Sequence, residues 1–486
     1  MNGTEPQDPI PSFCMDHGKP AIRLDNVRDF VVGVDHQVPL LDGRPTTYVN
    51  LDNAATTPPL EPILDCFHHF LEWYSSVHRG SGFKSLLSTY FYEKCRRVVA
   101  NFIGADLERH SLIFTQNATH SLNKLAARLA LKPDDVVLTT MLEHHSNLLP
   151  WRKTGCKIEY ANVSTADGSL DMADMEARVR RHAGHLALVT VSGASNVTGE
   201  LPPIRKIARL VHEHGSRLCV DATQFVPRRA LQMGALDDPE RIDFAAFSAH
   251  KMYAPFGAGV LVGPHSVFET GDPDTVGGGT VEAVTLDKVI WSAPPERDEA
   301  GTPNVPGAVA LACAIRVLES IGMENVAEHE RDLTRRALEA LTKMNGVTLY
   351  GSKDPAMRSD RLGVIPINVA GLNHGQLAAI LGYEWGIGVR NGCFCAQPYV
   401  RHLLGITDQE MLGIIGKLEA GDHATVPGMV RISFGVYNNR DEVDRIIEAL
   451  RAVLADGPRA KYSVDPQYHD YVPDTSTFDF DSYAPF

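Results

Sequence analysis

Between residues 136 and 263 the chain alternates short runs rich in β-branched residues with longer amphipathic stretches. The expected strands are VVLTT (136–140), KIEYANV (157–163), LALVTVS (186–192), RLCVD (217–221), DFAAFS (243–248) and GVLVG (259–263). Two intervening stretches, residues 170–184 and 202–215, are expected to be helices; the second opens with proline, which a first helical turn tolerates, and closes on glycine. This alternation is typical of an α/β fold with a mostly parallel sheet covered by helices.

The chain has 486 residues, which exceeds one ordinary hydrophobic core and favours two domains. After about residue 305 the pattern changes to long helices, such as 325–344 and 440–457, with isolated strands at 363–370 and 429–435. The predicted division is an N-terminal arm joining the small domain (1–45), a large domain (46–305), a small α+β domain (306–459) and a C-terminal tail (460–486).

The sequence also makes predictions about the two ends of the chain. One helix is expected in the arm, over residues 21–30. The tail mixes acidic and aromatic residues without a clear period, so it is expected to pack over a surface or a partner subunit, with a disordered tail as the alternative.

Charge and cysteine usage exclude several classes of protein. The formal net charge of −14 argues against a nucleic-acid surface, which needs clustered Lys and Arg. No run of about 18 apolar residues is present, and the N-terminus lacks the basic-then-apolar order of a signal peptide. We therefore expect a cytoplasmic protein that binds neither nucleic acid nor membrane. The eight scattered cysteines favour free thiols over a disulfide framework.

Two reactive residue types follow predicted strands, where ligands gather in open α/β sheets. Lys251 comes just after the strand 243–248, and a partly desolvated lysine there can act as a Schiff-base amine. Taken alone, a lysine at a strand end is more often a plain surface residue. Asp221 ends the strand 217–221, and its carboxylate can hold the protonated ring nitrogen of pyridoxal phosphate (PLP) or simply cap a helix.

Two further strand ends carry polar turns. In TQNATHSLNKLA, the backbone N–H groups of Ala118 and Thr119 and the Thr119 hydroxyl form either a phosphate cradle or an ordinary capped helix start. In MLEHHSNLLPW, His144 is a candidate flat partner for a ring, with His145 beside it. Paired histidines are more often plain hydrogen-bonding residues, and no HxxxH or HExxH spacing accompanies them, so no metal site is expected.

The order Thr119, His144, Asp221 and Lys251, each after a successive strand, is more specific than any one of them. With these motifs the sequence resembles class V aminotransferase-fold enzymes, and within them the cysteine desulfurase and selenocysteine lyase group. The motifs that carry the resemblance are NLDNAATTPP (50–59), VHRGSG (77–82), EHHSN (143–147), SNVTGELPPI (195–204), VDATQ (220–224), SAHKMYAPFGAGVLVG (248–263), GGGT (277–280), EAGTPN (299–304), RNGCFCAQP (390–398) and RISFGVYNNRDEVDR (431–445).

The resemblance implies PLP fold type I, with PLP as the cofactor. It implies that Lys251 holds the cofactor covalently, Asp221 contacts the pyridinium nitrogen, Gln224 lies near the phenolic oxygen and His144 stacks on the ring. Its implied phosphate-binding residues are Ala118, Thr119, Ser248 and His250, together with Thr280 acting on the phosphate of a neighbouring subunit. A homodimer with shared active sites is therefore implied. Asn196, Arg390 and Arg431 are the implied substrate-binding residues, and the guanidinium fork of Arg431 suits a carboxylate.

The stretch VRNGCFCAQPY holds two cysteines one residue apart. The resemblance implies that Cys395, which precedes Ala-Gln-Pro, is the nucleophile rather than a structural thiol. Cys393 stands where histidine is common in the matching bacterial enzymes, and GCFC also resembles the sulfurase domain of molybdenum-cofactor sulfurases. The pair is too closely spaced for an easy disulfide, and no second pair completes a zinc site, so Cys393 is expected to be a bystander or a resolving thiol.

The resemblance implies conversion of L-cysteine to L-alanine, with a persulfide on Cys395 for transfer to a possible protein acceptor. A free thiol is only a few per cent ionised at pH 7, so Cys395 needs help from Arg390 or the neighbouring imidazoles. Residues 399–430 form a longer segment than in short-loop desulfurases and predict a helix with an acidic loop at the mouth of the site. An enlarged mouth could admit a sulfur acceptor or a different amino acid.

Two alternatives remain at this point. One is another PLP-dependent enzyme that breaks a β-bond in secondary metabolism, such as a C–S lyase, epimerase or β-decarboxylase, in which Cys395 is unnecessary. The other is a non-catalytic sulfur-carrier scaffold that binds a partner through its tail. The joint presence of Lys251, Asp221 and Arg431 disfavours the second alternative, because binding alone would not need them.

Overall fold

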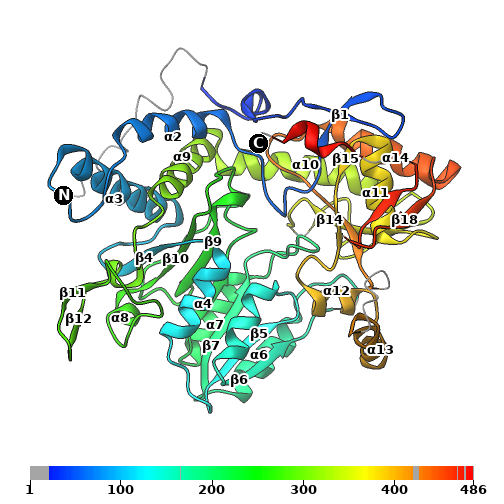
Figure 1. Ribbon diagram of the computed structural model, residues 1–486. Coiled ribbons are helices and arrows are strands. Elements are labelled where there is room, and N and C mark those ends of the chain that lie inside the picture. Colours follow the sequence, from blue (N-terminus) through cyan, green and yellow to red (C-terminus); the bar gives the residue numbers. More distant parts are fainter. Residues whose placement is uncertain are drawn as a thin grey trace.

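A computed structural model describes residues 21–164, 166–358, 360–419, 426–467, 469–475 and 478–484. Its centre is a seven-stranded sheet with the strand order β4–β10–β9–β8–β7–β5–β6 (Figure 1). The strands are β4 (His110–Thr115), β5 (Val136–Thr140), β6 (Lys157–Ala161), β7 (Leu186–Ser192), β8 (Leu218–Asp221), β9 (Phe244–Ser248) and β10 (Gly259–Pro264). All six strands predicted between residues 136 and 263 form, and the predicted α/β class is confirmed.

The direction of the strands decides where the site lies. Strand β10 is antiparallel to both of its neighbours, β4 and β9. The pairs from β9 through β6 are all parallel. The other six strands therefore point the same way, and their carboxyl ends meet at one edge of the sheet.

Both faces of the sheet are buried, which explains why its strands read as nearly continuous apolar runs. Neighbouring residues of one strand belong to different hydrophobic clusters, for example Leu112 and Ile113 in β4, or Val220 and Cys219 in β8. Successive side chains of a strand point to opposite faces, so the two clusters are the two layers between sheet and helices. The helices of this part are α2 (Glu61–Trp73), α3 (Phe83–Ile103), α4 (Ala118–Arg128), α5 (Leu149–Lys153), α6 (Met172–Arg181), α7 (Ile204–Glu213), α8 (His265–Phe268) and α9 (Val305–Ile321).

A second, antiparallel sheet has the order β13–β14–β17–β16 and its own hydrophobic cluster. Its strands are β13 (Val347–Leu349), β14 (Val364–Val369), β16 (Arg390–Gly392) and β17 (Met429–Ser433), and its helices are α10 (Met323–Leu341), α11 (His374–Trp385) and α14 (Arg440–Asp456). The N-terminal segment reaches this part, because β3 (Val49–Asn50) pairs in parallel with β15 (Ile387–Gly388). The predicted domain boundaries themselves stay a prediction.

The remaining elements lie outside the two main sheets. They are η1 (Val27–Phe30), β1 (Gln37–Pro39), β2 (Pro45–Thr47), η2 (His145–Asn147), η3 (Ala249–Lys251), β11 (Val281–Val284), β12 (Val289–Trp291), η4 (Glu296–Asp298), α12 (Gln397–Leu403), α13 (Asp408–Glu419), β18 (Tyr462–Val464), β19 (Tyr471–Pro473) and η5 (Phe480–Tyr483), where η marks a 3-10 helix. The segment 399–430 thus begins with two helices, and its residues 420–425 lie outside the described residues.

The helix expected over residues 21–30 is wrong. Only the short η1 forms, and the side chain of Asn26 holds the preceding backbone in a turn, taking the carbonyl of Ala21 that a helix would use. Its Oδ1 accepts a hydrogen bond from the N–H of Arg23 at 2.8 Å, and its Nδ2 donates to the carbonyl of Ala21 at 3.0 Å.

The described part of the tail packs on the molecule's own surface. Strand β19, which pairs with β18 in a hairpin, contacts α11. The ring of Phe478 stacks on Tyr383 of α11 with the centroids 4.5 Å apart. Residues 468, 476, 477, 485 and 486 of the tail, like residues 1–20 of the arm, lie outside the described residues.

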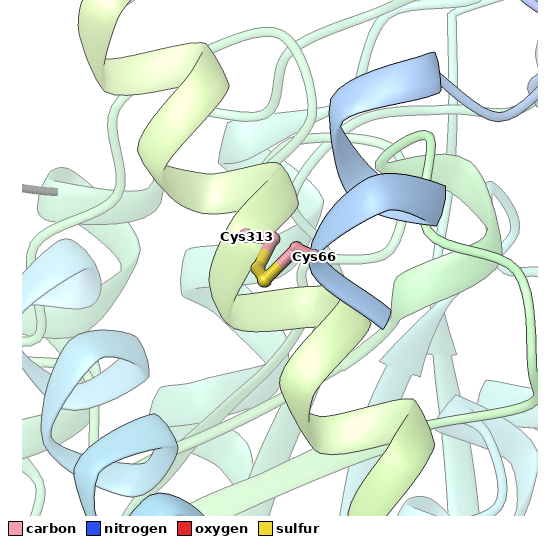
Figure 2. Close-up of a disulfide and its surroundings, with 2 residues drawn as sticks. All are labelled: Cys66 and Cys313. Atoms are coloured by element: carbon pink, nitrogen blue, oxygen red, sulfur yellow. A yellow bond between two sulfur atoms is a disulfide. The ribbon is translucent and has the colours of Figure 1, made fainter. Parts of the chain in front are cut away.

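The expectation that all cysteines are free is also wrong. Cys66 of α2 and Cys313 of α9 form a disulfide (Figure 2). The two residues are 247 positions apart in the sequence and meet only because α2 packs against α9. Within the described residues, Cys156, Cys219, Cys393 and Cys395 are free thiols.

In the part of the chain that the structure describes, no single helix is both long and apolar enough to cross a bilayer. Helices α9 and α10 meet the criteria of length and composition only when they are joined, and a 75° bend separates them.

Candidate active site

A cavity of about 400 Å³ opens where the carboxyl ends of the parallel strands meet the second sheet. Of the thirteen site residues named from the sequence, all except Thr280 line it. The lining members of that set are Ala118, Thr119, His144, Asn196, Asp221, Gln224, Ser248, His250, Lys251, Arg390, Cys395 and Arg431. Residues far apart in the sequence are therefore brought to one place by the sheet.

Lys251 is held at the end of η3, the short helix that follows β9. Burial lowers the pKa of its ammonium group to about 8, assisted by the positive charges of Arg431 and Arg228 and opposed by Asp221. About a tenth of the amine is therefore uncharged at pH 7, far more than for an exposed lysine, and the uncharged amine is the nucleophilic form.

Asp221 is the last residue of β8 and lies buried at the cavity wall. Its Oδ1 accepts a hydrogen bond from the N–H of Thr223 at 3.1 Å. Burial raises the pKa of this carboxyl, while the contacts with Thr223 and the charge of Lys251 oppose the rise. A buried carboxylate in this position is suited to bind a protonated nitrogen.

The N-terminus of α4 forms the polar end of the cavity. Asn117 caps the helix by accepting from the N–H of His120 at 2.9 Å. The N–H of Ala118 donates to the hydroxyl oxygen of Ser248 at 2.8 Å, and the hydroxyls of Thr119 and Ser146 are 2.6 Å apart. Hydroxyls and N–H groups at the positive end of a helix dipole make a site for an anion such as phosphate.

His144 is positioned by a buried network behind it. The carboxylate of Glu143 accepts from the hydroxyl of Thr140 at 2.6 Å, the amide of Asn147 at 2.7 Å and the hydroxyl of Ser192 at 2.7 Å. These contacts tie the loop after β5 to the end of β7. Burial raises the pKa of Glu143 to about 7, against the effect of its hydrogen bonds.

The histidines of the site are neutral at pH 7. Burial and the charge of Lys251 lower the pKa of His144 to about 3 and that of His250 to about 4. Burial and Arg152 also lower the pKa of His145. A neutral imidazole can stack on a ring, but it brings no positive charge to a nearby thiol.

Two cations lie on the side of the second sheet. Arg390 of β16 and Arg431 of β17 are paired residues in that sheet. Arg431 donates to Asp52 at 2.8 Å and to the carbonyl of Asn196 at 3.0 Å, and its guanidinium lies 5.0 Å from the ring centroid of Phe394. Within the described residues its buried Nε has no hydrogen-bond partner, which leaves a donor for a carboxylate.

The cysteine loop bends sharply beside the cavity. Phe394 and Cys395 both have positive φ angles, 53° and 54°, an uncommon arrangement for two successive residues with side chains. The carbonyl of Cys395 accepts from the N–H of His145 at 2.7 Å, and the amide of Asn196 donates to the carbonyl of Phe394 at 2.7 Å. The loop is thereby fixed with Cys395 exposed at the mouth of the cavity.

Cys393 has a different environment from Cys395. It is half-buried, and its thiol donates to the carbonyl of Pro427 at 3.1 Å. Burial raises its pKa to about 11, so it stays a thiol at neutral pH.

Thr280 stands apart from this cavity. It is fully buried and its hydroxyl donates to the carbonyl of Gly277 at 2.8 Å. Its expected action on a neighbouring subunit stays a prediction. Among the described residues, no group of three or more His, Cys, Asp or Glu is arranged to hold a metal ion.

Sequence reasoning missed several residues of the site. Asp52, which holds Arg431, lies inside the motif NLDNAATTPP, and Ser192 is the last residue of a predicted strand, so both had a signal. Phe394 lies inside the motif RNGCFCAQP and also had a signal, whereas Arg228 had none, because only the folded chain shows that it contacts Gln224.

Known proteins resemble this chain over most of its length. The family model for class-V aminotransferases matches residues 49–446. A cysteine desulfurase of Haloferax volcanii is 34% identical over 447 residues, which cover 89% of this chain and 96% of the relative.

Solved structures of cysteine desulfurases also resemble this chain over most of its length. The apo structure of a cysteine desulfurase from Thermococcus onnurineus aligns with a TM-score of 0.76 at 32% identity, covering 88% of this chain and 98% of the other. The cysteine desulfurase CsdA from Escherichia coli aligns with a TM-score of 0.72 at 27% identity, covering 90% and 99%. Family match, identity and fold lead to the same conclusion: this chain belongs to the class-V aminotransferase family.

Proposed function

We propose that this chain is a PLP-dependent cysteine desulfurase, which converts L-cysteine to L-alanine and carries the sulfur as a persulfide on Cys395. The observation that carries the proposal is that Lys251, Asp221, Arg431 and Cys395 line one cavity. The relatives named above as cysteine desulfurases support it.

The residues present fit PLP. Lys251 offers an amine of lowered pKa, and Asp221 offers a buried carboxylate for the pyridine nitrogen. The N-terminus of α4, with Ser248 and the hydroxyl of Thr119, would hold the phosphate. Neutral His144 would lie against the ring. When bound, PLP withdraws electrons from the α-carbon of an attached amino acid.

The remaining steps belong to the chain's own residues. The guanidinium of Arg431 and the amide of Asn196 bind the substrate carboxylate, with Arg390 at the outer side. Once released from the cofactor, the amine of Lys251 can accept the proton from Cα, because its pKa of about 8 lies close to neutral pH.

Cys395 then takes the sulfur. Its thiolate attacks the substrate thiol sulfur, so a sulfur–sulfur bond forms while the bond from Cβ to sulfur breaks and its electron pair stays with carbon. Protonation of that carbon, and return of a proton from the Lys251 amine to Cα, complete alanine. The neighbouring imidazoles are neutral, so the positive charges of the same cavity lining come from Lys251, Arg390 and Arg431. The exposed position of Cys395 leaves the persulfide accessible to a protein sulfur acceptor.

We also propose a homodimer with shared sites, in which Thr280 serves the phosphate of the neighbouring subunit, and a cytoplasmic location. The hairpin β11–β12, which follows Thr280 directly, is rich in exposed apolar residues: Val284, Leu286, Val289 and Ile290. Contact with a second subunit would cover such a surface.

The test is the release of alanine and sulfide from L-cysteine under reducing conditions, with Cys395→Ser compared against Cys393→Ser. The Cys395 variant is expected to lose both products while it keeps the visible absorption of bound PLP. The Cys393 variant is the matched control. The thiol of Cys393 is half-buried and donates to the carbonyl of Pro427, so the Cys393→Ser variant should remain active. Equal yields from wild type and Cys395→Ser would instead indicate PLP-dependent β-bond cleavage without a cysteine nucleophile.

A further inference from the structure

Arg228 is a buried cation next to the cavity that the proposed reaction does not use. Arg228 is only 7% exposed and lies in the turn after β8. The Nη1 group donates to Oε1 of Gln224 at 2.6 Å, and Nε lies 3.1 Å from Oε1 of Glu330 on α10. Arg228 therefore connects a residue of the cavity wall to a buried carboxylate behind it.

The contact with Arg228 fixes which end of the Gln224 amide faces the cavity. Oε1 of Gln224 is occupied by Arg228, while Nε2 donates to the carbonyl of Ala54 at 2.7 Å. An amide nitrogen carries two hydrogens, so one N–H remains after the bond to Ala54. Since Gln224 lines the cavity, this N–H is a donor for an acceptor that binds there.

The charge of Arg228 acts in the same direction. Its counter-ion Glu330 is shared, because Nη1 of Arg229 also contacts that carboxylate, at 2.9 Å. Arg229 has a second carboxylate partner, Asp360, at 3.1 Å. Arg228 is one of the cations that lower the pKa of Lys251, after burial and Arg431. A donor N–H and a nearby positive charge both stabilise an anionic oxygen.

We propose that Arg228 is a positioning residue for the cofactor: it holds the Gln224 amide with its N–H toward the cavity and adds positive charge that stabilises an anionic ring oxygen. The inference rests on the proposed function, since PLP supplies that oxygen. It follows that Arg228 helps to set the pH at which the nitrogen joining Lys251 to the cofactor loses its proton.

The experiment follows the visible absorption band of the PLP-loaded protein against pH, without substrate, in wild type and Arg228→Met. Loss of the cation and of the fixed amide should raise the pH midpoint of the band by about 0.5 unit or more. Arg229→Met is the matched control, because Arg229 is equally buried and binds the same Glu330 but has no contact with Gln224 among the described residues. Both variants are expected to lower the melting temperature, whereas only Arg228→Met should move the midpoint.

An unchanged midpoint in Arg228→Met, or the same shift in Arg229→Met, would overturn the proposal and leave Arg228 as a structural residue. Arg228→Lys carries the test where the Met variant fails to fold: it keeps the charge but not the fork that reaches both Gln224 and Glu330, so a smaller upward shift is expected. An unchanged midpoint there would equally overturn the proposal. Absence of a visible band in wild type supplied with PLP would be a failure of the proposed function itself.

Discussion

The lowered pKa of Lys251 gives the sharpest test of how the site works, because it can be examined before any substrate is present. The perturbation is pH, applied to protein from which the cofactor has been removed. An amine must be uncharged to attack an aldehyde, so the rate of PLP attachment reports the fraction of Lys251 that is free amine.

The magnitude follows from the environment of Lys251. Burial, with Arg431 as the largest charge effect, lowers its pKa from 10.5 to about 8. At pH 7 a pKa of 8 leaves about 9% of the amine uncharged, whereas 10.5 would leave about 0.03%, a difference of about 300-fold. The site therefore makes the lysine reactive at neutral pH without any further base.

The assay mixes cofactor-free protein with PLP and records the rate at which the visible band appears between pH 6 and 10. Below pH 8 the rate should rise about tenfold per pH unit, and above it the rate should level off. Arg431→Met should move this midpoint upward, because it removes the positive charge with the largest effect on the pKa of Lys251. A rate that keeps rising through pH 9 to 10 in wild type would refute the reasoning, since Lys251 would then titrate as an ordinary lysine.

Three other substitutions test separate parts of the structure. Asp221→Asn should lower alanine formation by about 100-fold or more, measured at saturating cysteine, because the amide carries no charge for the pyridine nitrogen. Arg361→Met should cost more than about 3 kcal/mol in urea unfolding, since the buried guanidinium donates to several backbone carbonyls; Arg358→Met, at an exposed position, should cost almost nothing. Thermal melts with and without a reductant test the disulfide between Cys66 and Cys313. Reduction should lower the stability of the wild type by about 2–5 kcal/mol and leave that of Cys66→Ser unchanged, because only the wild type has this disulfide to lose.

The central sheet could be predicted from the sequence because its strands are buried on both faces and read as apolar runs. Strands β5 and β7 have the bounds that the sequence indicated. The sequence of residues 21–30 predicted a helix wrongly. Its composition suits a helix, but the side chain of Asn26 binds the local backbone, and the sequence does not show that contact. The pairing of Cys66 with Cys313 depends on the packing of two helices that no local pattern connects.

The same limit applies to the site. Residues just after parallel strands were found because the strands deliver them to a common edge. Residues that act through another side chain were missed, since their role depends on tertiary contacts: Glu143 behind His144, and Arg228 behind Gln224. Sequence position locates the groups that face a ligand, and the folded structure is needed for those that hold them.

The electrostatics of the cavity also differ from those of the whole chain. The chain carries a formal charge of −14, yet the charged residues among the described lining are three cations, Lys251, Arg390 and Arg431, against the single carboxylate of Asp221. A local excess of positive charge suits two anions, the phosphate of PLP and the carboxylate of an amino acid. Burial, together with the charge of Arg431, also keeps Lys251 partly neutral until those anions arrive. Binding of either anion should then raise the pKa of Lys251, so that anion binding and proton uptake at this lysine are linked.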